Sequence, residues 1–154
     1  MTLRPASIAL FCVGVLAASL ASAETRPAKV AVSAVSVPPG TDARFKRALG
    51  DAISQHASAA GLAESMQGYS LAPALVQLRR YTEPGQKQAK VVCIVSLALK
   101  DPHDALVAEV RGNASAFGGT ALEALDAAAQ AAVMRVPAAL AKLRGASDVQ
   151  VAQR

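Results

Sequence analysis

Three strand-like segments in a row, joined only by short turns, constrain the fold of this chain more than any other feature of its sequence. The segments are residues 69–81, 89–100 and 106–116, and the turns between them read EPGQ and DPHD. Both turns contain the proline, glycine or aspartate that tight reversals favour. Strands linked by turns this short pair antiparallel. The sequence therefore predicts an antiparallel meander of three strands.

The middle and last of these segments each have one apolar face. On residues 89–100 that face consists of alternate residues, Val91, Cys93, Val95, Leu97 and Leu99. On the last segment it consists of Leu106, Ala108, Val110, Gly112, Ala114 and Ala116, and the opposite face is mostly polar. A period of two is typical of strands that bury one face against a core. Pro73 cannot donate a hydrogen bond to a neighbouring strand, so it marks residues 69–81 as an edge strand or as a strand with a break.

A further strand and a helix precede the meander. Residues 29–37 are rich in valine, and their β-branched side chains predict a strand. The PPG corner that follows ends this strand, and Thr41 is the predicted N-cap of a helix. Apolar residues then recur at helical spacing over residues 45–60, and Gly61 is the predicted C-cap.

The last predicted helix starts at Thr120, where the sequence TALE forms a capping box. An apolar stripe continues from Leu122 to Leu143, Pro137 is expected to kink or divide the helix, and Gly145 ends it. The order of elements is therefore β-α-β-β-β-α. We predict an α+β two-layer sandwich, in which a four-stranded, mostly antiparallel sheet carries two helices on one face.

Residues 1–23 have the features of a secretory signal peptide. Arg4 precedes an apolar stretch, and Ala-Ser-Ala at the end of this segment forms a small-residue cleavage site. The apolar stretch is short for a transmembrane helix, and no later run is long enough to cross a bilayer. Cys12 follows the bulky Phe11, so we do not interpret it as a lipid-attachment cysteine. We expect an exported protein, periplasmic or secreted.

Cleavage after residue 23 would leave one domain over residues 24–145 and a polar, flexible tail over residues 146–154. The mature chain would then contain a single cysteine, Cys93, which excludes an intramolecular disulfide. Because Cys93 lies in phase with the apolar face of its strand, we expect a buried and inert thiol. The alternative is an intermolecular disulfide, which would need Cys93 to be exposed.

The composition argues against a nucleic-acid-binding protein, and the chain lacks the short motifs of common enzyme classes. Hydrophobic residues make up 53% of the chain, but 36 of the 154 residues are alanine, which buries little surface. Without the leader the chain has 15 basic and 11 acidic side chains, a net charge of +4 that is too small and scattered for nucleic-acid binding. No G-x-S-x-G, H-E-x-x-H, phosphate-loop or paired-cysteine motif occurs. We therefore predict no catalytic residues and no cofactor.

The most distinctive polar segment is LRRYTEPGQKQAK, residues 78–90, where four cations and a tyrosine surround one predicted hairpin turn. The candidate binding residues are Arg79, Arg80, Tyr81, Lys87 and Lys90. Adjacent strands would bring these side chains together, and Glu83 is the only acid among them. They would bind an anionic envelope component, either phospholipid, lipopolysaccharide or an acidic patch on a partner protein. The alternative is that the cations solvate the hairpin end and keep its strand edge from pairing with another sheet.

The two histidines are the remaining candidates for chemistry. His103 lies between Asp101 and Asp104, but Asp-Pro also suits a hairpin turn, and three ligands from one short turn rarely complete a metal shell. We therefore predict no metal. His56 lies beside the apolar stripe of the first helix, where we expect a boundary residue rather than a catalytic base. A small metal-dependent hydrolase built on either histidine is one alternative, and a structural protein that assembles through an open strand edge is another.

The order of elements over residues 29–144 resembles that of small accessory domains of the bacterial envelope. It is similar to the lipopolysaccharide-assembly lipoprotein and to the auxiliary lipoproteins of ABC-type lipid transporters. The resemblance rests on the order of helices and strands, and no shared motif transfers a functional residue to this chain. It implies a non-catalytic, exported binding or accessory domain, whose partner would be an envelope protein, an anionic lipid or lipopolysaccharide.

Overall fold

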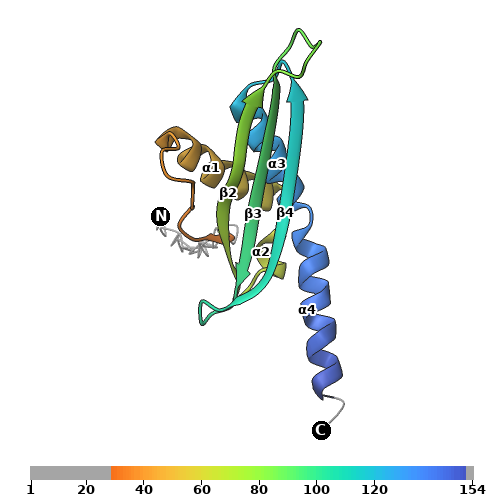
Figure 1. The fold of residues 1–154 in the computed structure, drawn as a ribbon. Coiled ribbons are helices and arrows are strands. Elements are labelled where there is room, and N and C mark those ends of the chain that lie inside the picture. The colour runs from red at the N-terminus through yellow and green to blue at the C-terminus, as the bar shows by residue number, and fades with distance from the viewer. Residues whose placement is uncertain (1–28, 152–154) are drawn as a thin grey trace, which may run out of the picture.

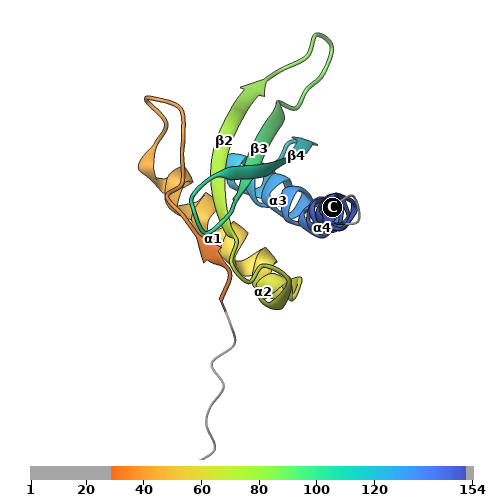
Figure 2. The same cartoon turned by 90° about the horizontal axis from the view of Figure 1, so that it is seen from below.

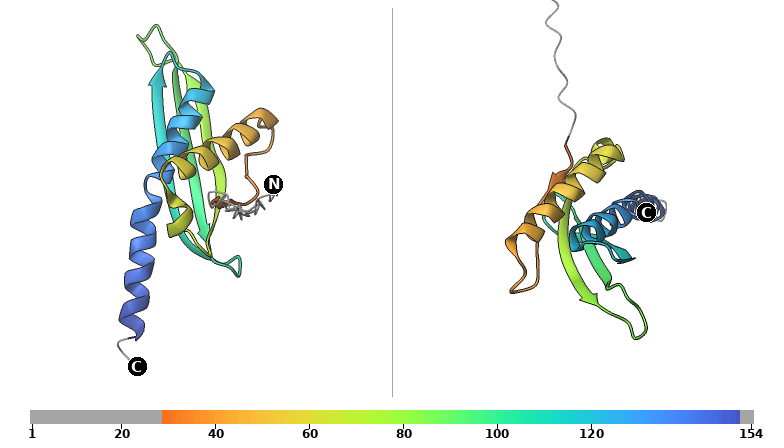
Figure 3. Two further views of the ribbon diagram at one scale, coloured as in Figure 1. Left: turned by 180° about the vertical axis from the view of Figure 1, so that it is seen from behind. Right: turned by 90° about the horizontal axis from the view of Figure 1, so that it is seen from above.

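The computed structural model describes residues 29–151, with side chains to residue 145, so the predicted leader lies outside the described residues. Within this range four strands form one mixed sheet in the order β1-β2-β3-β4. The elements are β1 (Ala31–Val32), α1 (Ala43–Ala59), α2 (Leu62–Ser65), β2 (Ser70–Tyr81), β3 (Lys90–Lys100), β4 (Leu106–Phe117), α3 (Ala121–Val133) and α4 (Val136–Val151). Helices α1 and α3 lie on the same face of the sheet (Figures 1 and 3). The predicted α+β two-layer sandwich is confirmed.

The predicted antiparallel meander is present as β2, β3 and β4. Strand β3 pairs antiparallel with both neighbours, and Cys93 at its centre lies between Leu78 of β2 and Ala114 of β4. Strand β1 pairs parallel with β2 at the other side of the sheet. The chain reaches β2 from β1 through helices α1 and α2, as a parallel connection requires.

Strand β1 is much shorter than the predicted strand over residues 29–37. Its ladder stops at Val32 and resumes at Ser36, whose N–H donates to the Pro73 carbonyl over 2.9 Å and whose carbonyl accepts from the Leu75 N–H over 2.9 Å. Val30 and Val32 precede the interruption and Val35 and Val37 follow it. The interruption therefore explains why the two pairs do not follow one alternating pattern. Pro73 does not lie at a free edge, because β1 and Ser36 pair beside it through its carbonyl, which proline retains.

The first helix differs from its prediction at the N-terminus. Its N-cap is Asp42 rather than Thr41, and the Asp42 carboxylate accepts a hydrogen bond from the Arg44 N–H over 2.9 Å. The single-turn helix α2 follows at once and was not predicted. Gly61 lies between the two helices with a φ of +64°, a left-handed conformation that glycine adopts without strain.

The second predicted helix is divided into α3 and α4. Thr120 and Glu123 form the predicted capping box at the start of α3. Pro137 is the second residue of α4, where its missing N–H removes no helical hydrogen bond. Helix α4 does not end at Gly145, as predicted, but continues to Val151, beyond the end of the sheet (Figure 1). None of the described helices is long and apolar enough to span a membrane.

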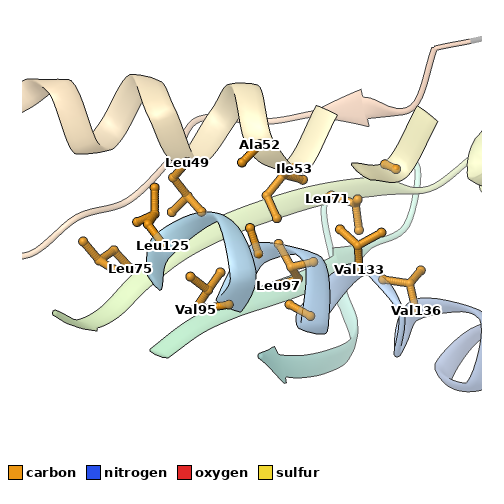
Figure 4. Close-up of a cluster of buried hydrophobic side chains, with 14 of the residues drawn as sticks. Leu49, Ala52, Ile53, Leu71, Leu75, Val95, Leu97, Leu125, Val133 and Val136 are labelled. Carbon is orange, nitrogen blue, oxygen red and sulfur yellow. The ribbon is translucent and has the colours of Figure 1, made fainter. Parts of the chain in front are cut away.

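The core lies between the helical layer and the covered face of the sheet (Figure 4). Its largest fully buried side chains include Leu49, Ile53, Leu71, Leu97, Leu125 and Val133. Helix α3 approaches the sheet closely through small residues, because a Cβ placed on Gly112 would lie 1.9 Å from the Ala128 carbonyl oxygen. The alanine-rich helix and this glycine therefore compensate for the small number of bulky core residues.

Leu106 was predicted on the apolar face of its strand and is instead 61% exposed. The pairing of β3 with β4 shifts by one residue between Leu99 and Lys100, so that Leu106 lies opposite Lys100. Val107 is the extra residue, and it packs against the core. A one-residue shift moves side chains to the opposite face of a sheet, and this is the reason for the error.

Candidate functional site

The structure places the five candidate binding residues together at the end of the β2–β3 hairpin. Arg79, Arg80 and Tyr81 are the last residues of β2, Lys90 is the first residue of β3, and Lys87 lies in the loop between them. The loop extends past the helices that cover the sheet (Figures 1 and 2). This end of the molecule is therefore accessible to a large partner.

A β-bulge at Val76 decides which way the two arginines point. The register of β2 against β3 shifts by one residue there, so that Leu78 lies opposite the buried Cys93 and faces the helices. Arg79, the next residue, projects from the opposite face of the sheet, which α1 and α3 do not cover and which we call the open face. Arg80 points back to the side of the helices. The sequence grouped the arginines correctly along the chain, but the structure places them on opposite faces of the strand.

Lys90 is held in place by its neighbours. Its Nζ lies 3.0 Å from Glu83 Oε1 and 5.2 Å from the centre of the Phe117 ring. The hydrogen bond to Glu83 raises the pKa of Lys90, and the negative charge of Glu83 and the nearby Tyr81 raise it further. Lys90 therefore remains protonated at neutral pH and is paired within the hairpin, rather than free to bind a partner.

The other three cations of the hairpin have no such partner. Arg79, Arg80 and Lys87 are exposed, and none of them forms an ion pair with a residue between 29 and 145. The only acid of the segment, Glu83, is already engaged by Lys90. The end of the hairpin thus has an uncompensated positive charge, which favours association with anions.

Over its final residues β2 pairs with β3 on one side, and no strand within residues 29–151 pairs with its other side. Pairing on that side ends at the bridge between Ser36 and Ala74. A hollow of about 650 Å³ follows the uncovered edge and is lined by Gln77, Arg79, Arg80 and Tyr81. Guanidinium groups bind phosphate and carboxylate groups with two parallel hydrogen bonds. The arrangement suits the binding of an anionic group at the surface.

The carboxylates of the DPHD turn stabilise the turn itself. The Asp101 side chain accepts hydrogen bonds from the N–H groups of His103 and Ala105 over 2.8 and 2.9 Å. Asp104 pairs with Lys100 over 2.9 Å. Among the described residues no group of three or more side chains is arranged to hold a metal ion. The two aspartates around His103 are therefore accounted for by the turn.

His56 lies at the boundary of the core, as predicted. Its Nε2 is 2.9 Å from Asp126 Oδ1, and this contact joins α1 to α3. The side chain of His56 is 19% exposed and that of Asp126 is 56% exposed. His56 therefore has a structural role, which is to link α1 to α3 at the surface.

Cys93 is fully buried beneath the helices, and it is a free thiol. Burial raises the pKa of this thiol to about 11, so the reactive thiolate is disfavoured. The prediction that Cys93 is buried is confirmed, and its inertness stays a prediction.

Phe117 was not identified from the sequence, although it lies opposite Lys90 in the register and is 49% exposed. Counting residues outward from the DPHD turn without a bulge would place Ala116 opposite Lys90 instead. The extra residue at Val107 brings Phe117 into this position. Tyr81, Lys90 and Phe117 thus form a row across three strands on the open face of the sheet.

No family model and no characterised protein sequence matches this chain. Its fold does match solved structures. A minor lipoprotein of Acinetobacter baumannii superposes with a TM-score of 0.50 at 13% identity, over 72% of this chain and 94% of that one. A Caulobacter crescentus CB15 protein described as a lipoprotein gives 0.47 at 14% identity, over 75% and 91% of the two chains. A PelC variant from Paraburkholderia phytofirmans, a dodecamer, gives 0.42 at 17% identity, over 68% and 87%.

At these identities a structural match establishes the fold and nothing finer. The described domain has the fold of a small bacterial lipoprotein, and it spans nearly all of the Acinetobacter chain. The predicted resemblance to small envelope lipoproteins is confirmed at the level of the fold. No residue of the hairpin is transferred from these proteins.

Proposed function

We propose that this protein is a non-catalytic accessory domain of the bacterial envelope that binds an anionic envelope component through the end of its β2–β3 hairpin. One observation carries the proposal. Three exposed cations, Arg79, Arg80 and Lys87, lie at a projecting hairpin and lack ion pairs within residues 29–145. An anionic headgroup or an acidic patch would supply the missing charge.

The envelope location rests on two further observations. The first 23 residues have the pattern of a secretory leader. The fold is similar to that of an Acinetobacter protein described as a lipoprotein. In this chain Phe11 precedes Cys12, so we propose export by the leader without a lipid attached at that cysteine.

A non-catalytic role is supported by the state of the reactive side chains. The Cys93 thiol is buried, and His56 is paired with Asp126. The carboxylates beside His103 are engaged by the turn and by Lys100. Exposed cations without ion pairs can bind an anionic component, and such binding needs no reactive side chain.

The proposal is tested with the double variant Arg79→Glu and Arg80→Glu, assayed by sedimentation with vesicles that contain phosphatidylglycerol and by pull-down on immobilised lipopolysaccharide. Each cation near an anionic membrane contributes about 1 kcal/mol, so we expect binding to fall at least about tenfold. The matched control is Lys46→Glu with Arg47→Glu, two exposed consecutive cations on α1 that form no ion pair with a residue between 29 and 145. The control changes the net charge equally and should retain most of the binding.

Thermal unfolding of both double variants should match that of the unmodified protein, because all four side chains are exposed. If the hairpin variant and the control lose the same amount of vesicle and lipopolysaccharide binding, the binding is a non-specific attraction to the net charge of the protein. Unchanged binding in the hairpin variant would exclude the hairpin as the binding surface.

A further inference from the structure

A second hollow lies at the opposite edge of the sheet, between β4 and α4. It has a volume of about 390 Å³, and we name it the β4–α4 groove. Its walls include Ala108, Glu109 and Val110 of β4, Arg135 between the helices, and Ala138 and Lys142 of α4. Figure 1 shows α4 and the first half of β4 diverging from the point where α3 ends. This volume lies within the range of ligand-sized sites.

One wall of the groove is the outer edge of the sheet. The Gly118 N–H donates to the Ala89 carbonyl, so the even-numbered residues of β4 direct their backbone groups toward β3. Glu109 and Arg111 therefore direct their N–H and C=O groups outward. The Arg111 carbonyl already accepts a hydrogen bond from the Arg135 guanidinium, which shows that a donor reaches this edge. The backbone groups of Glu109 lie beside the groove, available to an added strand.

The charges on the groove favour an acidic occupant. Arg135 and Lys142 are both exposed, and Lys142 has no ion pair with any residue between 29 and 145. The only acid in the lining is Glu109, whose side chain is bound by Ser96 over 2.7 Å and by Arg111 over 3.0 Å. The groove is thus positively charged, and alanines between its cations leave room for a ligand.

We propose that the β4–α4 groove binds an extended acidic segment of a partner protein, which adds alongside β4. Main-chain hydrogen bonds to Glu109 extend the sheet, as in other complexes where a peptide pairs with an open strand edge. Acidic side chains of the segment pair with Arg135 and Lys142. A single-chain anionic lipid would use the same cations but would leave the backbone groups of Glu109 unpaired, and the test separates the two.

The probe is a fluorescently labelled, capped hexapeptide of alternating glutamate and valine, with a lysine–valine hexapeptide as its counterpart. Fluorescence anisotropy with the mature chain should show binding of the acidic peptide and none of the basic one. Lys142→Glu should weaken binding about fivefold or more, since it replaces an attraction with a repulsion. Ala138→Phe, at an exposed position, should weaken it by filling the groove. Lys46→Glu, an equal change of charge on α1, should alter the Kd by less than about twofold.

The structural readout is the amide of Glu109. Strand addition should slow its hydrogen exchange when the acidic peptide is bound, and sodium dodecanoate should not. Equal weakening by Lys142→Glu and Lys46→Glu would overturn the proposal, and so would tight binding of dodecanoate in place of the peptide. The Arg79→Glu and Arg80→Glu variant should retain peptide binding, because both arginines lie on β2, which β3 separates from β4.

Discussion

Two side chains on β3, Cys93 and Ser96, are both buried although they face opposite sides of the sheet. Cys93 is buried beneath the helices, and no charged side chain within residues 29–145 lowers the pKa of its thiol. Ser96 faces the other side and is only 7% exposed, yet its hydroxyl donates to Glu109 Oε1 over 2.7 Å. A buried polar group costs little when it is hydrogen-bonded. The reactivity of the Cys93 thiol and the hydrogen bond from Ser96 to Glu109 can therefore be tested in separate experiments.

We expect Cys93 to resist a water-soluble maleimide in the native protein at neutral pH. The thiol is 0% exposed, and burial raises its pKa to about 11. Labelling followed by mass spectrometry should show modification only on the timescale of unfolding, and rapid modification in guanidinium chloride. Rapid stoichiometric labelling without denaturant would mean that the inward face of β3 is wrongly assigned.

We expect Ser96→Ala to raise the pKa of Glu109. The Ser96 hydrogen bond is the main cause that lowers this pKa, and Arg111 lowers it further. A lowered folded-state pKa contributes stability above the unfolded pKa, and this contribution is lost as the pH falls through the folded pKa. The variant should lose less stability on acidification. Carboxyl NMR titration measures the shift, and Ser115→Ala, also on the open face, is the control expected to leave the Glu109 pKa unchanged.

At the scale of elements, the close contact of α3 with β4 depends on small residues from both. Gly112 lies against Ala128 and Ala132, and an added Cβ would be 1.9 Å from one backbone atom and 2.4 Å from another. Backbone atoms cannot move aside without shifting the whole helix. The capping box at Thr120 fixes where that helix begins. Gly112 therefore limits how closely the two layers pack.

We expect Gly112→Ala to lower the free energy of unfolding by at least about 2 kcal/mol, because a methyl group would overpack the contact. Gly145→Ala is the matched control. It lies within α4 with nothing within 4 Å of an added Cβ, and alanine should stabilise the helix by up to about 1 kcal/mol. Urea denaturation followed by circular dichroism measures both values. Similar stabilities for the two variants would show that α3 can move away from β4 at little cost.

At the scale of the whole molecule, the sheet has two different uncovered edges among the described residues. The end of β2 is uncovered because β1 is short, and there Arg79 and Arg80 line the edge. The edge of β4 is approached by Arg135 and by the diverging α4. The open face of the sheet connects the two edges. The hairpin and groove proposals together predict that the domain contacts two partners at once, and the separate hairpin and groove experiments test this prediction.

Much of the architecture could be predicted from local patterns. The alternation on residues 89–100, the two turns and the capping box at Thr120 predicted the meander and the start of α3, and the phase of Cys93 predicted its burial. Each of these signals acts over a few neighbouring residues, where side-chain period and hydrogen bonding are set by the sequence itself. The grouping of cations around the hairpin turn was predicted for the same reason.

The errors have a different origin, because they depend on how distant segments pack. The bulges at Val76 and Val107 set the faces of Arg79 and Leu106. Pro73, three residues before Val76, indicated a break in that strand but not its register, and no proline or glycine lies within four residues of Val107. The pairing of Lys90 with Glu83, the exposure of Phe117 and the groove beside Arg135 follow from these registers and from the path of α4. Local sequence patterns were enough to predict the meander, the two main helices and the burial of the thiol, whereas helix α2 was missed. Which of the described cations stay unpaired depends on strand register and helix direction, and the packing of the core sets both.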